Sequence, residues 1–199
     1  MRYLWLLLAI ASSTVLAGDV SPATSDFFPC RSCHGDNGWG SEATRTPAIA
    51  GQDAGYLSRQ LHSYRDGGRG NHPGDPYGRQ MALMAANLDE QSIARLAEYI
   101  SAMPPPPARL EARPNQPGQE LYKTCAACHG SSGEGIAELK APRLSGQYPS
   151  YLMGELKKFR SGIRGNAEQD VNARQMAAAA ANLGDREIAL LAEFISGLK

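Results

Sequence analysis

The 199-residue sequence lacks the features that mark most nucleotide-binding, nucleic-acid-binding and membrane-spanning proteins. Lys+Arg and Asp+Glu are 20 each, so no positive excess is available to neutralise phosphates, which argues against nucleic acid as a partner. There is no P-loop and no H-E-x-x-H motif, and the glycine-rich segment 35–40 has the wrong spacing for a dinucleotide fingerprint. The apolar stretch 4–11 is shorter than the roughly 20 residues of a membrane span. The composition is therefore that of an ordinary globular protein.

The first residues have the pattern of an export signal, which we assign to 1–17. Arg2 provides a positive start, 4–11 are apolar, and Val15 and Ala17 place small residues before a cleavage site at Gly18. A retained anchor, which would associate the protein with a membrane, is the alternative. Either way the protein is expected outside the cytoplasm, where thiols do not stay free.

A tandem repeat organises the rest of the chain. The segment Cys30–Gly35 (CRSCHG) recurs 95 residues later as Cys125–Gly130 (CAACHG), and the same offset carries many further matches, among them Pro47 to Pro142 and Tyr56-Leu57 to Tyr151-Leu152. No insertion is needed from the first cysteine onward. Fixed self-similarity of this kind indicates a duplicated small domain.

The repeat gives the domain boundaries. We expect domain 1 at 18–103, a linker at 104–117 and domain 2 at 118–199. Four consecutive prolines, 104–107, open the linker and favour extended polyproline II, which makes it semi-rigid.

Each copy has the periodicity of helices. Leu57, Leu61 and Tyr64 recur at helical spacing, as do their counterparts in copy two. Asp89 and Gly184 are the expected N-caps of the last helix in each copy. No alternating strand pattern stands out, so the fold class is all-α. A unit of about 85 residues has a small core and often needs a cofactor to complete it.

The repeated C-x-x-C-H is the attachment signature of c-type haem. Its two thiols lie one helical turn apart and can add to the two vinyl groups of one porphyrin, while the next residue, His34 or His129, reaches the iron. This predicts two haem c groups, on Cys30 and Cys33 and on Cys125 and Cys128. The alternatives are disulfides, a thioredoxin-like redox pair and a zinc site. A thioredoxin-like pair requires surrounding βαβ structure.

The second axial ligand of each iron follows by elimination. Copy two has only one histidine, His129, so its other ligand must be a different residue type. Thioether sulfur is the usual choice. Only Met81 and Met176 occupy matching positions, each 47 residues after its histidine. Met84 is a competitor to Met81, since its counterpart is Ala179.

With His and Met on both sides, each iron has no open position for a substrate. The expected function is outer-sphere electron transfer and not enzymatic turnover.

The sequence resembles dihaem class I cytochromes c of the cytochrome c4 family over nearly all of its mature length. C-x-x-C-H-G, P-x-x-x-G-Q-x-x-x-Y-L, the methionine and N-L-x-x-x-x-I all occur twice. The resemblance implies two class I cytochrome c domains around one haem each, with the carbonyls of Pro47 and Pro142 orienting the proximal histidines. It also implies a periplasmic monomer that passes electrons from a quinol–cytochrome c reductase to a terminal oxidase or other reductase.

One departure from the family, one candidate role and two alternative functions complete the expectations. Pro29, directly before Cys30, should break the first helix of domain 1. Arg69 and Arg164, in matched Arg-Gly-Asn turns, are candidate partners of haem propionates. The alternative functions are an electron-transfer subunit of a dehydrogenase, such as a sulfide-oxidising flavocytochrome c, and a dihaem enzyme with one open iron.

Overall fold

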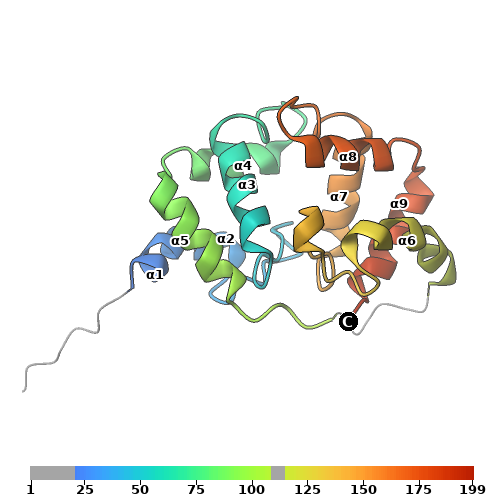
Figure 1. Ribbon diagram of the computed structural model, residues 1–199, viewed down its shortest axis with the longest axis horizontal. Coiled ribbons are helices and arrows are strands. Elements are labelled where there is room, and N and C mark those ends of the chain that lie inside the picture. The colour runs from blue at the N-terminus through green and yellow to red at the C-terminus, as the bar shows by residue number, and fades with distance from the viewer. Residues whose placement is uncertain (1–20, 109–114) are drawn as a thin grey trace, which may run out of the picture.

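The computed structural model describes residues 21–108 and 115–199, which form two helical halves side by side (Figure 1). The expected export segment, 1–17, lies outside the described residues. Within them the regular structure is helical, with isolated bridges at Ser41–Thr46 and Ile136–Ala141 and no strand. The predicted all-α class is therefore confirmed. No helix in the described part is long and apolar enough to cross a membrane.

The first half contains α1 to α5. Their bounds are α1 Pro22–Phe27, the 3₁₀ turn η1 Phe28–Cys30, α2 Arg31–His34, α3 Ala54–Arg65, α4 Pro76–Ala85 and α5 Glu90–Ser101. The predicted cap of α5 is present, because the Asp89 carboxylate accepts a hydrogen bond from the Ser92 N–H at 2.7 Å.

The second half repeats this order with one fewer helix. It contains α6 Gln116–His129, the 3₁₀ turn η2 Ala137–Leu139, α7 Pro149–Arg160, α8 Val171–Ala180 and α9 Asp185–Ser196. Gly184 is the N-cap of α9, as expected, and its N–H donates to the Glu187 carboxylate at 2.7 Å. The single helix α6 replaces α1, η1 and α2 because Pro29 has no counterpart in the second copy.

Each half has its own apolar core, and the two cores are built from the same repeat positions. One consists of Phe27, Leu57, Leu96, Ala97 and Ile100; the other of Tyr122, Leu152, Leu191, Ala192 and Ile195. Every member of the first set has its partner in the second at the offset of 95. Phe27 and Tyr122 differ only by a hydroxyl, which donates to the Gly130 carbonyl at 2.8 Å. The duplication thus preserves the packing as well as the motif.

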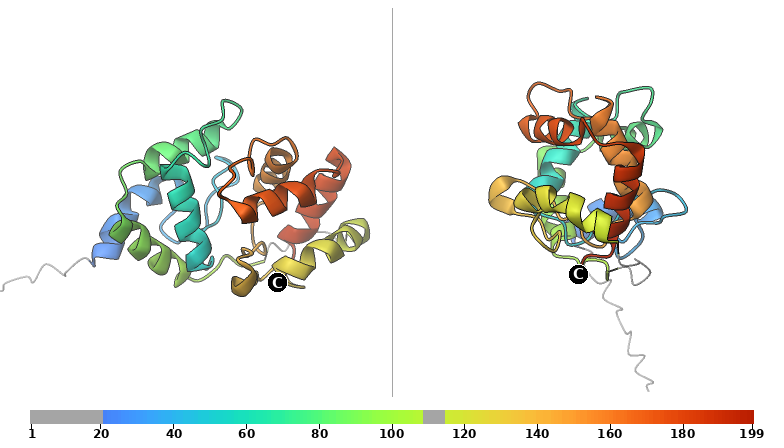
Figure 2. Two further views of the ribbon diagram at one scale, coloured as in Figure 1. Left: turned by 45° about the horizontal axis from the view of Figure 1, so that its top comes forward. Right: turned by 90° about the vertical axis from the view of Figure 1, so that its right-hand side faces the viewer.

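The segment that follows α5 runs along one edge of the molecule from the first half to the second (Figures 1 and 2). At the start of this segment, the Trp39 indole N–H donates a hydrogen bond to the Pro104 carbonyl at 3.0 Å. Pro106, further along it, is buried. Helix α6 begins at Gln116, inside the linker expected at 104–117, because Asn115 caps it and Pro117 lies in its first turn, where proline is tolerated.

Candidate haem-binding sites

Both C-x-x-C-H motifs end a helix. In the second half Cys125 and Cys128 lie on α6, which finishes at His129; in the first half the motif spans η1 and α2, which finishes at His34. The glycine after each histidine has a positive φ, 77° at Gly35 and 82° at Gly130. Residues other than glycine rarely adopt this backbone conformation. The chain therefore turns away at once, and the histidine remains at the helix end.

The four thiols are free, and thiols at equivalent positions of the repeat have the same class of exposure. Cys30 and Cys125 are half-buried, whereas Cys33 and Cys128 are exposed. Burial raises the pKa of the two half-buried thiols. No disulfide joins them, and no group of three or more His, Cys, Asp or Glu side chains in the described ranges could hold a metal ion. The spacing of the two thiols in each motif is the one that attachment to a single porphyrin requires.

The two histidines are buried and held in one orientation. Each is 5% exposed, and its Nδ1 donates to a proline carbonyl, that of Pro47 at 3.0 Å for His34 and that of Pro142 at 2.9 Å for His129. Burial lowers the pKa of both rings although the carbonyl bonds oppose this, so the neutral form is favoured. A neutral imidazole with Nδ1–H engaged offers Nε2 to a metal. Thiols, helix end and ring orientation together fit a covalently bound haem.

The predicted methionine ligands occupy matching helices. Met81 lies on α4 and Met176 on α8, and both are half-buried. Met84, one turn further along α4, is 46% exposed. The difference in burial favours Met81 over its competitor. The spare histidine His62, whose counterpart in the repeat is Lys157, instead donates from Nε2 to the Glu90 carboxylate of α5 at 2.8 Å.

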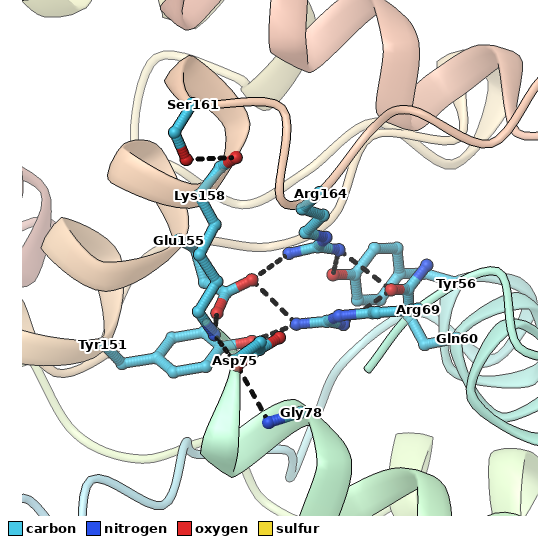
Figure 3. A network of polar contacts seen from close by, with 10 residues as sticks. All are labelled: Tyr56, Gln60, Arg69, Asp75, Gly78, Tyr151, Glu155, Lys158, Ser161 and Arg164. Carbon is cyan, nitrogen blue, oxygen red and sulfur yellow. Dashed lines mark hydrogen bonds and ion pairs between the residues drawn. The ribbon is translucent and has the colours of Figure 1, made fainter. Parts of the chain in front are cut away.

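A buried polar network joins the two halves where α3 faces α7 (Figure 3). Arg69 donates to Glu155 at 2.8 Å and to the Tyr151 hydroxyl at 3.2 Å, both in the second half. Arg164 donates to Glu155 at 2.6 Å and, in return, to the Tyr56 hydroxyl of the first half at 3.1 Å. The two arginines therefore exchange equivalent contacts across the boundary.

Gln60 and Glu155 lie at the centre of the network and are equivalent positions of the repeat. Arg69 and Arg164 both donate to the Gln60 side-chain oxygen, at 2.6 and 2.8 Å. Burial disfavours the Glu155 carboxylate, but Arg69, Arg164 and Lys158 outweigh it and lower its pKa to about 2. Glu155 is thus a buried anion that two buried cations require.

The sequence suggested Arg69 and Arg164 as propionate partners, and this stays a prediction. In the structure each arginine donates hydrogen bonds within its own half and to the opposite half. Sequence reasoning missed Gln60, Glu155 and the tyrosines of this network. A signal was available, since Tyr56 and Tyr151 recur at the offset of 95 without belonging to the haem motif. In the structure these two tyrosines accept equivalent bonds from Arg164 and Arg69 of the opposite half, as matching patches of a two-fold interface do.

Comparison with known proteins agrees with the site chemistry. The cytochrome c family profile matches residues 26–104 and 116–199. Cytochrome c4 of Azotobacter vinelandii is 32% identical over 98% of this chain and 96% of its own length. A thiosulfate dehydrogenase electron acceptor of Stutzerimonas stutzeri is 31% identical over 91% of this chain and 82% of its own.

A solved structure has the same arrangement of two halves. The crystal structure of reduced recombinant cytochrome c4 from Pseudomonas stutzeri aligns with a TM-score of 0.76 at 29% identity, covering 92% of this chain and all of that one. The two tandem domains expected from the repeat are therefore confirmed at the level of the whole fold.

Proposed function

Because this chain belongs to the cytochrome c4 family of dihaem electron carriers, we propose that its irons are ligated by His34 and Met81 and by His129 and Met176. The chain binds two haem c through Cys30, Cys33, Cys125 and Cys128. When bound, each haem supplies an iron that cycles between Fe(II) and Fe(III) by one electron. The protein's contribution is to orient the ligands, with Pro47 and Pro142 holding the imidazoles.

The observation that carries the ligand assignment is the matched pair of sites. In each half a buried histidine is fixed through Nδ1, and a half-buried methionine lies on the helix at the same repeat position. Sulfur ligation at the remaining position of each iron raises the reduction potential and leaves no coordination site for substrate. The irons are then suited to outer-sphere transfer.

For the physiological route, we infer a periplasmic monomer that carries electrons from a quinol–cytochrome c reductase to a terminal oxidase or other reductase. The export pattern of residues 1–17 supports this location. The domain limits follow the repeat, with 18–103 and 118–199 each around one haem and the proline-rich segment between.

The purified protein should contain two haems c per chain, both low-spin. A pyridine haemochrome assay gives the haem count, and the absorption spectrum of the oxidised protein should show the weak red band of Met–Fe(III) ligation. Fewer than two haems, or a high-spin spectrum from one of them, would contradict the assignment and restore the hypothesis of a dihaem enzyme.

A second donor has a specific observation in its favour. The 31% identity to a thiosulfate dehydrogenase electron acceptor, over 91% of this chain, supports reduction by a dehydrogenase that oxidises a sulfur compound. Stopped-flow reduction by a purified thiosulfate dehydrogenase and by a quinol–cytochrome c reductase, under the same conditions, separates the two routes. Fast reduction by the dehydrogenase alone would favour the second donor, and a stable complex with it would indicate a subunit.

A further inference from the structure

Two glutamines of the repeated P-x-x-x-G-Q segment cross the boundary between the halves. Gln147 accepts a hydrogen bond from the Ala48 N–H at 3.0 Å and donates one to the Ala48 carbonyl at 2.9 Å. Gln52, its equivalent, accepts from the Arg143 N–H at 2.8 Å and donates to the Arg143 carbonyl at 2.9 Å. Each side-chain amide thus pairs with the backbone of one residue of the opposite domain.

The orientation of both amides is fixed by a third bond. The oxygen of Gln147 also accepts from the Tyr148 N–H, and that of Gln52 from the Asp53 N–H, each at 3.0 Å. An amide turned by 180° would set its NH₂ group against two N–H donors, so only the orientation described satisfies the network. The contacts on Ala48 are shielded from water, because Ala48 and Gln147 are each 9% exposed.

The contacted residues lie directly after the prolines that orient the histidines. The N–H of Ala48 and the carbonyl of Pro47 belong to one planar peptide unit. That unit accepts from His34 Nδ1 at 3.0 Å on one side and donates to Gln147 Oε1 on the other. The peptide between Pro142 and Arg143 joins His129 to Gln52 in the same way.

We propose that Gln147 and Gln52 are positioning residues that act in trans, each holding and polarising the peptide that orients the proximal histidine of the opposite domain. The inference rests on the proposed axial role of His34 and His129. An acceptor on the peptide N–H makes the same peptide's carbonyl a stronger acceptor. The hydrogen bond from the histidine Nδ1–H to this carbonyl is then stronger, and the imidazole becomes a more basic ligand. A more basic ligand favours Fe(III). Docking of the domains thereby tunes both haems.

Substitution of Gln147 tests the direction of the effect. Gln147→Met keeps the chain length but removes the acceptor, so haem 1 should become easier to reduce, by about threefold in its reduced-to-oxidised ratio at fixed potential, or about 30 mV. Gln147→Glu keeps the acceptor for the Ala48 N–H and adds charge, although it loses the donor to the Ala48 carbonyl, so haem 1 should shift the opposite way. Haem 2 should be unchanged in both. Gln52→Met should shift haem 2 and leave haem 1.

The measurement is a redox titration of the holoprotein, followed by NMR of haem methyl resonances assigned to each domain, with the exposed Gln91→Met on α5 as control. Amide hydrogen exchange of Ala48 provides a second measurement, and should accelerate in Gln147→Met alone. Shifts of both haems together, shifts of the same sign for Met and Glu, or no shift would each overturn the trans role. Wild-type protein without two low-spin haems would instead overturn the proposed function.

Discussion

Replacing Met81 by alanine should remove the sulfur ligand from haem 1 and open a position on its iron. The red Met–Fe(III) band should fall to about half, because haem 2 keeps its own ligand, and the potential of haem 1 should drop, since thioether ligation favours the reduced state. The vacated position should also give the protein a peroxidase activity that the wild type lacks. Absorption and electron paramagnetic resonance spectra of the oxidised protein measure the change.

The matched control for this substitution lies one helical turn away. Met84 is 46% exposed, so Met84→Ala should leave the band, the potential and the haem count unaltered. Met176→Ala should reproduce the Met81→Ala result for haem 2, where Ala179 occupies the position of the competitor. A loss of the band in Met84→Ala, with Met81→Ala unaffected, would reverse the ligand assignment in domain 1.

The sequence was sufficient to predict the helices and the core positions within each domain. Leu57 and Leu152 recur at helical spacing because each faces its own core, and Asp89 precedes a helix because its carboxylate caps it. The effect of Pro29 was also predictable, since proline removes a backbone donor wherever it falls. These inferences depend on interactions between residues close together in the sequence, so the sequence alone is enough to make them.

Contacts between the two copies could not be predicted in the same way. The offset of 95 shows that Arg69 and Arg164 are equivalent, but equivalence within a repeat gives no information on how one copy docks against the other. A haem propionate and a buried carboxylate are both anions that the arginine of such an Arg-Gly-Asn turn can bind. Only the fold brings Glu155 to both arginines, and only the fold places Gln147 beside the peptide that holds His34.

Replacing Glu155 by glutamine should strongly destabilise the protein, because it leaves Arg69 and Arg164 buried without their carboxylate partner. Removing one partner of a buried ionic group costs about 3 to 5 kcal/mol. The variant would carry glutamine at both equivalent positions, 60 and 155, with two cations between them. Guanidinium titration of the holoprotein, followed by far-ultraviolet circular dichroism, measures the free energy of unfolding.

The control is a glutamate whose side chain is exposed to solvent. Glu120 on α6 is 60% exposed and contacts only Lys123 among the cations of the described part, so Glu120→Gln should cost less than about 1 kcal/mol. If both variants lost the same small amount of unfolding free energy, the buried network would make no net contribution to stability. A loss confined to Glu155→Gln supports its role in docking the domains.

Glu155 also predicts how wild-type stability depends on pH. Its pKa is about 2 in the folded protein and 4.5 ordinarily, so the unfolded chain binds the proton more readily. The contribution of this group is therefore complete above about pH 4.5 and is lost as pH falls toward 2; the difference corresponds to about 3 kcal/mol. Glu155→Gln should lack this part of the acid sensitivity, while Glu120→Gln should retain it. If wild type and Glu155→Gln lost stability in parallel between pH 4.5 and 2, another group would have to be the acid-sensitive one.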